Sequence, residues 1–168
     1  TIAADCEDCL PRFFAWCLPI FKNIVIVTSE SEDTTLRIIQ KVASENPHII
    51  VKHRELDDFA RQKQFCADLA PTEWKIIIDA DEILEDIDLD ACIEKLTAAT
   101  TDVMAFPRFN LQSDEYHYLK AGFPDFQERL FNSRVTYNLD APIHEQLEGA
   151  RKKGTSNKHI IHCKHLTQ

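Results

Sequence analysis

Residues 74–85 read WKIIIDADEILE, and the fold can be predicted outward from this stretch. The isoleucines at 76–78 are typical of a strand that is buried on both faces. The strand ends in three carboxylates within four residues, Asp79, Asp81 and Glu82. Carboxylates this close repel one another beside a buried strand unless a cation lies among them. Because Mg2+ and Mn2+ prefer oxygen ligands and bridge them to phosphates, the stretch favours a metal site over a solvated acidic loop.

The spacing of these carboxylates excludes an EF-hand calcium loop. Counted from Asp79, that loop requires an oxygen ligand at its fifth position, glycine at its sixth and glutamate at its twelfth. The sequence has Ile83, Leu84 and Asp90 at those positions. Mg2+ and Mn2+ are therefore the predicted ions.

The composition predicts one globular domain. A chain of 168 residues, 44% hydrophobic and 28% charged, has the size and balance of a single domain. A net charge of −9 argues against a protein that wraps nucleic acid. No apolar run reaches the roughly 20 residues of a transmembrane segment. The chain begins at Thr1, which leaves open a preceding signal or membrane segment.

The six cysteines favour a reducing, cytoplasmic setting, because a domain of this size does not need disulfides to fold. Cys6 and Cys9 nevertheless have the spacing of a zinc-ligand pair, with Cys163 and His165 as possible partners. One alternative function is therefore that of a non-catalytic interaction domain stabilised by zinc.

Strand and helix patterns alternate along the first half of the chain. Strands that alternate with helices of this length form βαβ units, right-handed crossovers and a parallel sheet. We predict strands within 1–4 and over 24–28, 49–53 and 74–78, with helices over 8–18, from about 34 to 46 and over 59–69. Later in the chain we predict a helix with Asp88 as its N-cap and strands over 103–110, 127–132 and 159–162.

Two acidic loops follow strands of this predicted sheet. Residues 29–33 read SESED and residues 79–82 read DADE. The ligand crevice of an open parallel sheet lies at the carboxyl ends of its strands, so we expect both loops at that edge. The chain has three glycines and no glycine-rich phosphate loop. A metal held by carboxylates is therefore the predicted means of binding phosphates.

Five motifs in order resemble the family-2 glycosyltransferases of the GT-A fold. They are SEDTT at 31–35, ARQ at 60–62, DADE at 79–82, PDFQERLF at 124–131 and HE at 144–145. The resemblance covers nearly the whole chain and implies a single Rossmann-like α/β domain over residues 1–168. Its central sheet would be mostly parallel and flanked by helices.

The resemblance also implies transfer of a sugar from a nucleotide-diphosphate donor, with a UDP-sugar favoured, assisted by Mn2+ or Mg2+. Asp79 would face the ribose or sugar, and Asp81 would bind the metal on the diphosphate. A metal there stabilises the charge that develops on the leaving group. The acceptor, whether glycan, protein or lipid, is not specified. The implied nucleotide-sugar contacts are Thr28, Glu30, Asp33, Arg61, Asp79, Ala80 and Asp81.

Most members of the resembled family invert the anomeric centre, which requires a carboxylate base on the acceptor hydroxyl. Asp125 is the first candidate and Glu145 the second. The implied metal ligands are Asp79 and Asp81, with His144 or His162 as candidates for a third.

Several of these residues also have structural interpretations. Asp125 fits a turn after residues 122–124, and Arg61 fits a helix-start residue paired with Asp57 or Asp58. A metal-dependent nucleotidyltransferase is a further alternative, but it normally requires a glycine- and lysine- or arginine-rich loop that the sequence lacks. The residues that fit equally well as caps or loop stabilisers are Thr28, Glu30 and Asp33.

Overall fold

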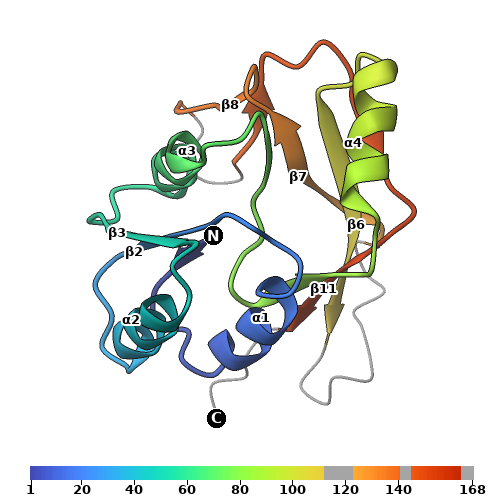
Figure 1. Cartoon of the computed structure of the whole chain (residues 1–168). Coiled ribbons are helices and arrows are strands. Elements are labelled where there is room, and N and C mark those ends of the chain that lie inside the picture. Colours follow the sequence, from blue (N-terminus) through green and yellow to red (C-terminus); the bar gives the residue numbers. More distant parts are fainter. Residues whose placement is uncertain (112–122, 141–144, 164–168) are drawn as a thin grey trace. The chain divides into compact units, whose positions relative to one another are not determined.

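The structure is a computed structural model that describes residues 1–111, 123–140 and 145–163 (Figure 1). Its internal contacts divide the chain into two compact units, and each unit has its own sheet. Unit 1 comprises Thr1–Thr72 and Tyr137–Gln146, and unit 2 comprises Glu73–Thr136 and Leu147–Gln168.

The sheet of unit 1 is built on β2 (Ile24–Thr28), whose five residues are all buried. Its β-branched side chains favour extended backbone. β1 (Ile2–Ala3) and β3 (Ile49–His53) pair with β2 in parallel, one on each side. The parallel sheet predicted for this part of the chain is confirmed.

The helices in the described part of unit 1 are α1 (Leu10–Cys17), α2 (Thr35–Glu45) and α3 (Phe59–Leu69). Helix α3 packs against β1 and β2, and α2 packs against β3. α3 begins where the carboxylate of Asp58 accepts a hydrogen bond from the backbone N–H of Arg61 at 2.7 Å. This cap satisfies one of the N–H groups that have no partner within the helix.

Unit 2 contains a six-stranded mixed sheet with the path β4-β7-β6-β11-β5, and β10 pairs with β6 off this path. Neighbours are antiparallel except for β6 with β10 and β6 with β11. Short strands β8 (Thr136–Tyr137) and β9 (Leu147–Glu148) lie where the chain passes between the units. The elements of unit 2 are β4 (Trp74–Ile76), β5 (Glu82–Leu84), α4 (Leu89–Ala98), β6 (Val103–Leu111), β7 (Asp125–Asn132), β10 (Lys153–Thr155) and β11 (Ile160–Cys163).

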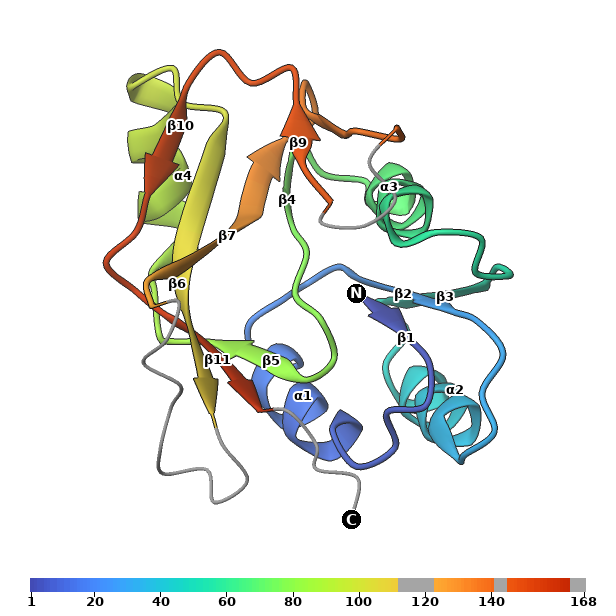
Figure 2. The same cartoon turned by 180° about the vertical axis from the view of Figure 1, so that it is seen from behind.

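Strand β6 lies at the centre of this sheet, and β10 and β11 both pair with it in parallel (Figure 2). Lys153 pairs with Val103 at one end of β6, and Cys163 pairs with Leu111 at the other. Phe106, Leu130, Phe131 and Ile160 are almost wholly buried between these strands and their neighbours. Because β11 ends beside the end of β6, polar side chains from distant parts of the sequence meet there.

The isoleucine stretch departs from its prediction in two respects, its length as a strand and the direction of its pairing. Regular strand structure ends at Ile76, and β4 pairs antiparallel with β7 in the mixed sheet. Ile77 and Ile78 remain buried, and the N–H of Ile77 donates to the carbonyl of Arg129. The apolar run correctly predicted burial, but hydrophobicity does not select the partner or direction of a strand. Strand β5, immediately after the acidic residues Asp79 and Asp81, was not predicted.

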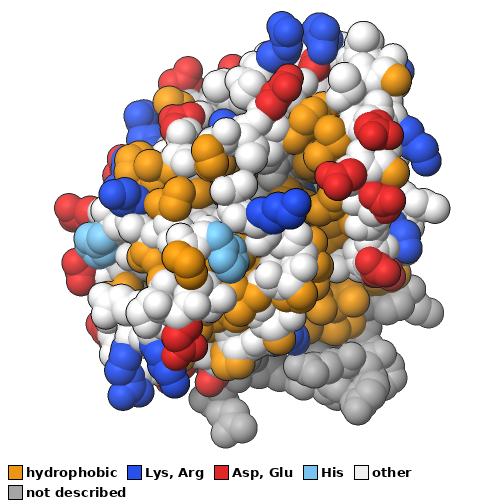
Figure 3. Space-filling view, viewed as in Figure 1, with side chains coloured by type: hydrophobic (Ala, Val, Ile, Leu, Met, Phe, Trp, Pro, Cys, Tyr) orange, Lys and Arg blue, Asp and Glu red, His pale blue; other side chains and the backbone are white. Residues whose placement is uncertain are grey.

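Acidic side chains gather over and beside α4 on the face drawn in Figure 3. The carboxylate of Asp88 caps this helix by accepting from the N–H of Ala91 at 2.9 Å, as the sequence predicts. Exposed Asp86, Asp90 and Glu94 complete this acidic surface. Within the described residues, no helix has the length and apolar character needed to cross a membrane.

Candidate functional site

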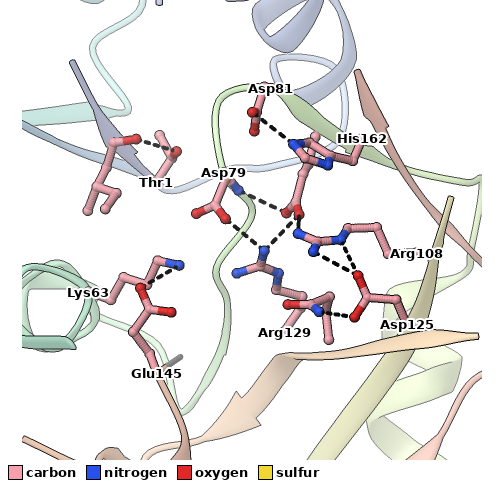
Figure 4. Close-up of polar contacts among 12 residues, drawn as sticks. Thr1, Lys63, Asp79, Asp81, Arg108, Asp125, Arg129, Glu145 and His162 are labelled. Carbon is pink, nitrogen blue, oxygen red and sulfur yellow. Dashed lines mark hydrogen bonds and ion pairs between the residues drawn. The ribbon is translucent and has the colours of Figure 1, made fainter. Parts of the chain in front are cut away.

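The acidic loop of unit 2 is a tight turn tied by its own backbone. The N–H of Glu82 donates to the carbonyl of Asp79 at 3.0 Å, and the N–H of Asp79 donates to Glu82 Oε2 at 3.2 Å. Ala80 is buried within the turn, and the side chain of Asp81 is 35% exposed. The carboxylates of Asp79 and Asp81 therefore lie in different surroundings (Figure 4).

Glu82 is wholly buried and lies between two guanidinium groups. Its Oε1 accepts from Arg129 Nη2 at 2.7 Å and from Arg108 Nη1 at 3.0 Å. Arg129 Nη2 also contacts Asp79 Oδ2 at 2.7 Å. The repulsion inferred between the carboxylates of the loop is thus offset at Asp79 and Glu82 by arginines of the protein itself.

Asp81 faces a different partner, the imidazole of His162 in β11. Its Oδ2 lies 3.0 Å from His162 Nε2, and the N–H of Cys163 donates to the Asp81 carbonyl at 3.0 Å. Sheet register explains the meeting, because His162 pairs with Glu82 of β5 on one side and with Asn110 of β6 on the other. Directly paired residues project to the same face of a sheet. Two predicted metal ligands are therefore adjacent, although 81 residues separate them in sequence.

Asp125 is held at the start of β7 by three side chains. Its Oδ2 accepts from Arg108 Nη2 at 2.7 Å and Nε at 2.9 Å, and from Asn110 Nδ2 at 3.3 Å. Its Oδ1 accepts from Gln127 Nε2 at 2.7 Å. Burial raises the pKa of this carboxyl, but the bonds from Arg108, Asn110 and Gln127 outweigh burial and hold the pKa below its usual value. Asp125 is thus an anchored, ionised carboxylate.

These contacts form one polar cluster, which we call the carboxylate–arginine network. It consists of Asp79, Glu82, Arg108, Asp125 and Arg129, all in unit 2. Figure 4 shows Arg129 against the acidic-loop carboxylates Asp79 and Glu82, and Arg108 between Glu82 and Asp125 of β7. Three negative and two positive groups leave the network with one excess negative charge.

The predicted donor contacts Thr28 and Glu30 lie at and after the carboxyl end of β2 in unit 1. Buried Thr28 donates through its Oγ1 to the Lys52 carbonyl at 3.4 Å. Glu30 Oε1 lies 3.3 Å from His53 Nε2 at a highly exposed position. Both residues therefore belong to the polar edge where the parallel strands end.

Asp33 joins two loops of unit 1. Its carboxylate accepts from the N–H groups of Thr35 at 2.8 Å and Glu7 at 3.0 Å. Burial raises the pKa of Asp33, but the bonds from Thr35 and Glu7 prevail and lower it. In return, Glu7 Oε2 accepts from the N–H of Thr34 at 2.9 Å. The loop-stabilising interpretation of Asp33 is therefore what the structure shows.

Arg61 forms an ion pair with Asp58, one of the two structural partners expected from the sequence. Its Nε lies 2.8 Å from Asp58 Oδ2, within the first turn of α3. Asp57 pairs instead with Arg54, whose Nη1 donates to Asp57 Oδ1 at 2.8 Å. The side chain of Arg61 is 47% exposed, so it also reaches solvent.

Glu145, the second candidate base, lies in unit 1 beside a buried lysine. Its Oε1 is 3.4 Å from Lys63 Nζ, and both side chains are largely shielded from solvent. His144, its neighbour and a predicted metal ligand, falls outside the described residues.

No group of three or more His, Cys, Asp and Glu side chains is placed to hold a metal ion within residues 1–111, 123–140 and 145–163. The two adjacent donors Asp81 and His162 are thus the part of the predicted metal set that the structure brings together. Cys6 and Cys9 do not complete a zinc site among the described residues, and His165 lies outside them.

The sequence interpretation assigned no role to Arg108, Asn110 or Arg129. One signal was present, because polar Arg108 and Asn110 flank Phe109 in a predicted strand. Alternation of this kind predicts a polar face on one side of a strand. The partners on that face were not predictable, since they come from β5, β7 and β11.

The fold belongs to the class of GT-A glycosyltransferases, with α/β architecture and a partly mixed sheet. The chain itself belongs to glycosyl transferase family 2, whose family model matches residues 3–161.

Solved structures of S. aureus TarS have the same fold. TarS 1-349 in complex with UDP-GlcNAc matches with a TM-score of 0.71 and 13% identity over 99% of this chain and 58% of that one. TarS 1-349 in complex with UDP gives 0.70 and 12%, over 97% of this chain and 60% of that one. Another TarS structure also gives 0.70 and 12%, and this chain covers 36% of it. The chain thus spans between about a third and three fifths of these relatives.

Proposed function

We propose that this domain transfers a sugar from a UDP-sugar to an acceptor hydroxyl, with Mn2+ or Mg2+ and with inversion at the anomeric carbon. Membership of glycosyl transferase family 2 supports the reaction class. The complexes of TarS with UDP-GlcNAc and UDP support a uridine donor. The observation that carries the metal proposal is the meeting of Asp81 Oδ2 and His162 Nε2 at 3.0 Å.

The donor atoms at this point fit a divalent ion. Carboxylate oxygen and imidazole nitrogen are both ligands of Mn2+ in proteins. The Asp81 side chain is 35% exposed, which leaves room for diphosphate oxygens and water as further ligands. When bound, the ion would stabilise the negative charge that develops on the departing diphosphate. We assign Asp81 and His162 as its protein ligands. Asp79 is not assigned as a ligand, because its carboxylate is paired with Arg129.

Each unit contributes its own proposed donor contacts. In unit 2, Asp79 is paired with Arg129 and would accept a hydrogen bond from a ribose or sugar hydroxyl. Ala80 supplies backbone within the same turn. In unit 1, the proposed contacts are Thr28, Glu30, Asp33 and Arg61. Among these, Glu30 and Arg61 have the most exposed polar groups.

Asp125 remains the first proposed base and Glu145 the second. A base must be ionised before it accepts the proton of the acceptor hydroxyl. The arginine-bound Asp125 satisfies this condition down to acidic pH, but a lowered pKa also makes it a weaker base. Glu145, beside Lys63, is ion-paired in the same general way. An Asp125→Asn and Glu145→Gln comparison of kcat identifies the base, because only loss of the base should nearly abolish turnover.

The metal and donor proposals are tested by thermal unfolding with UDP or GDP, each with Mn2+, with Mg2+ and with chelator. A ligand at a hundred times its Kd adds about 2.7 kcal/mol. For a chain of this size, Tm changes by roughly 2–4 °C per kcal/mol, so we expect a shift of several degrees. The shift should require both UDP and metal.

The matched control is a second carboxylate on the same unit. Asp81→Asn should remove the shift, whereas Asp86→Asn, an exposed aspartate before α4, should retain it. A UDP shift of equal size in chelator would refute the metal dependence. Absence of a shift with either nucleotide, under all metal conditions, would overturn the proposed donor.

A further inference from the structure

Asn110 bridges two functional candidates that do not touch each other. It lies in β6, where its Oδ1 is 2.6 Å from His162 Nδ1 of β11. Its Nδ2 donates to Asp125 Oδ2 of β7 at 3.3 Å. The single carboxamide thus connects a proposed metal ligand on one side with a proposed base on the other.

The Asp125 contact determines which way the carboxamide faces. An ionised carboxylate only accepts hydrogen bonds, and Asp125 is kept ionised by its ion pair with Arg108. The NH2 group of Asn110 must therefore face Asp125, and the carbonyl oxygen must face His162. Because that oxygen only accepts, His162 must donate from Nδ1.

A proton on Nδ1 defines the chemistry at the opposite ring nitrogen. In the neutral imidazole, only one nitrogen carries a proton, so Nε2 then presents a lone pair. This lone pair points at Asp81 Oδ2 from 3.0 Å, and that oxygen is an acceptor as well. Two acceptors at this separation repel unless a cation is shared between them. Metal-binding histidines are commonly oriented in this way, through a hydrogen bond to the other ring nitrogen.

We propose that Asn110 is a positioning residue that holds His162 in the Nδ1–H form and so presents the Nε2 lone pair to a divalent ion shared with Asp81. The proposal rests on the proposed metal-dependent function and extends it to a residue that does not itself bind the metal. Asn110 is in turn oriented by Asp125, so the carboxylate–arginine network also sets the geometry of the metal ligand.

Asn110→Leu removes both polar contacts while keeping a side chain of similar size. Its matched control is Gln127→Leu, which removes a hydrogen bond to the same Asp125 carboxylate but none to His162. Mn2+ affinity in the presence of UDP is measured from the electron paramagnetic resonance signal of free Mn2+. Loss of an outer partner of a metal ligand typically weakens binding by about 10–100-fold. We expect this loss in Asn110→Leu and a change of less than about threefold in Gln127→Leu.

The tautomer is read independently by long-range 15N–1H NMR of the histidine ring in protein with UDP and diamagnetic Mg2+ bound, with His162→Gln to assign the signal. We expect Nδ1–H with an unprotonated Nε2 in the wild type and a mixture of tautomers in Asn110→Leu. Normal metal binding by Asn110→Leu, or a wild-type ring with its proton on Nε2, would overturn the role of Asn110 and leave the proposed function standing. Wild-type protein that binds UDP equally tightly with and without Mn2+ would refute the metal dependence. The purpose assigned to Asn110 would then fall too, even if the tautomer is as expected.

Discussion

Replacing Glu82 by glutamine tests whether the carboxylate–arginine network depends on charge. Glu82 is wholly buried, and its Oε1 accepts from both Arg108 and Arg129. Glutamine keeps the size and shape of the side chain but removes the negative charge between two guanidinium groups. It also places an NH2 group either against the N–H of Asp79 or against an arginine, so that two donors face each other.

The expected cost follows from the number and kind of contacts affected. A hydrogen bond to a charged group contributes about 1.5–3 kcal/mol, and Glu82 has two from arginines. Breaking a buried ion pair by removing one partner costs about 3–5 kcal/mol. We expect Glu82→Gln to lower the free energy of unfolding of unit 2 by about 3–5 kcal/mol, which corresponds to a fall in Tm on the order of 10 °C.

Glu128→Gln is the matched control, because Glu128 forms an ion pair with Lys153 at 2.7 Å in the same sheet but with both side chains partly exposed. Exposed pairs contribute about 0–1 kcal/mol. Urea unfolding is followed by tryptophan fluorescence in a Trp16→Phe background, so that Trp74 in β4 reports on unit 2 alone. A loss for Glu82→Gln no larger than that for Glu128→Gln would refute the electrostatic account of the network.

Two further predictions concern a titratable group and a helix cap. Asp125→Asn should cost about 1–2 kcal/mol at pH 7, because a partly exposed ion pair with Arg108 is lost. The folded-state pKa of Asp125 lies below the unfolded value of about 3.9, so its contribution is full above that value and is lost as pH falls through the lower folded-state pKa. In urea titrations of both proteins from pH 7 to pH 3, the gap in free energy of unfolding should therefore narrow as pH falls below about 3.9, and a constant gap would contradict the assignment. Asp58→Ala, which removes the N-cap of α3, should cost about 1 kcal/mol in urea unfolding read from Trp16, whereas Asp68→Ala at an exposed position of the same helix should cost a few tenths.

The strands, helices and the helix cap discussed below were predictable because they depend on residues close to one another in the sequence. The β-branched runs at 24–28 and 49–53 became β2 and β3 with the predicted bounds. Helical spacing of apolar residues gave α1 to α3 within a few residues of their observed ends, and Asp88 is the predicted N-cap of α4. These properties depend on neighbours within one or two turns, so the linear sequence contains them.

The position of the predicted ligands required the tertiary structure. Asp81 and His162 were both named from the sequence, but their meeting depends on the registers of β11 with β5 and with β6. The same applies to Arg129, which lies within a recognised motif yet acts by neutralising Asp79 and Glu82.

The sequence by itself determined where the chain forms strands, helices and caps, which strand end carries the acidic loop, and which family the chain resembles. Only the tertiary structure decided that the isoleucine strand runs antiparallel to β7, that arginines offset two of the three loop carboxylates, and that Asn110 links His162 to Asp125. The physical reason is that periodicity along a chain reports burial and backbone conformation. Strand partners and side-chain contacts depend instead on pairing register between segments that are tens of residues apart.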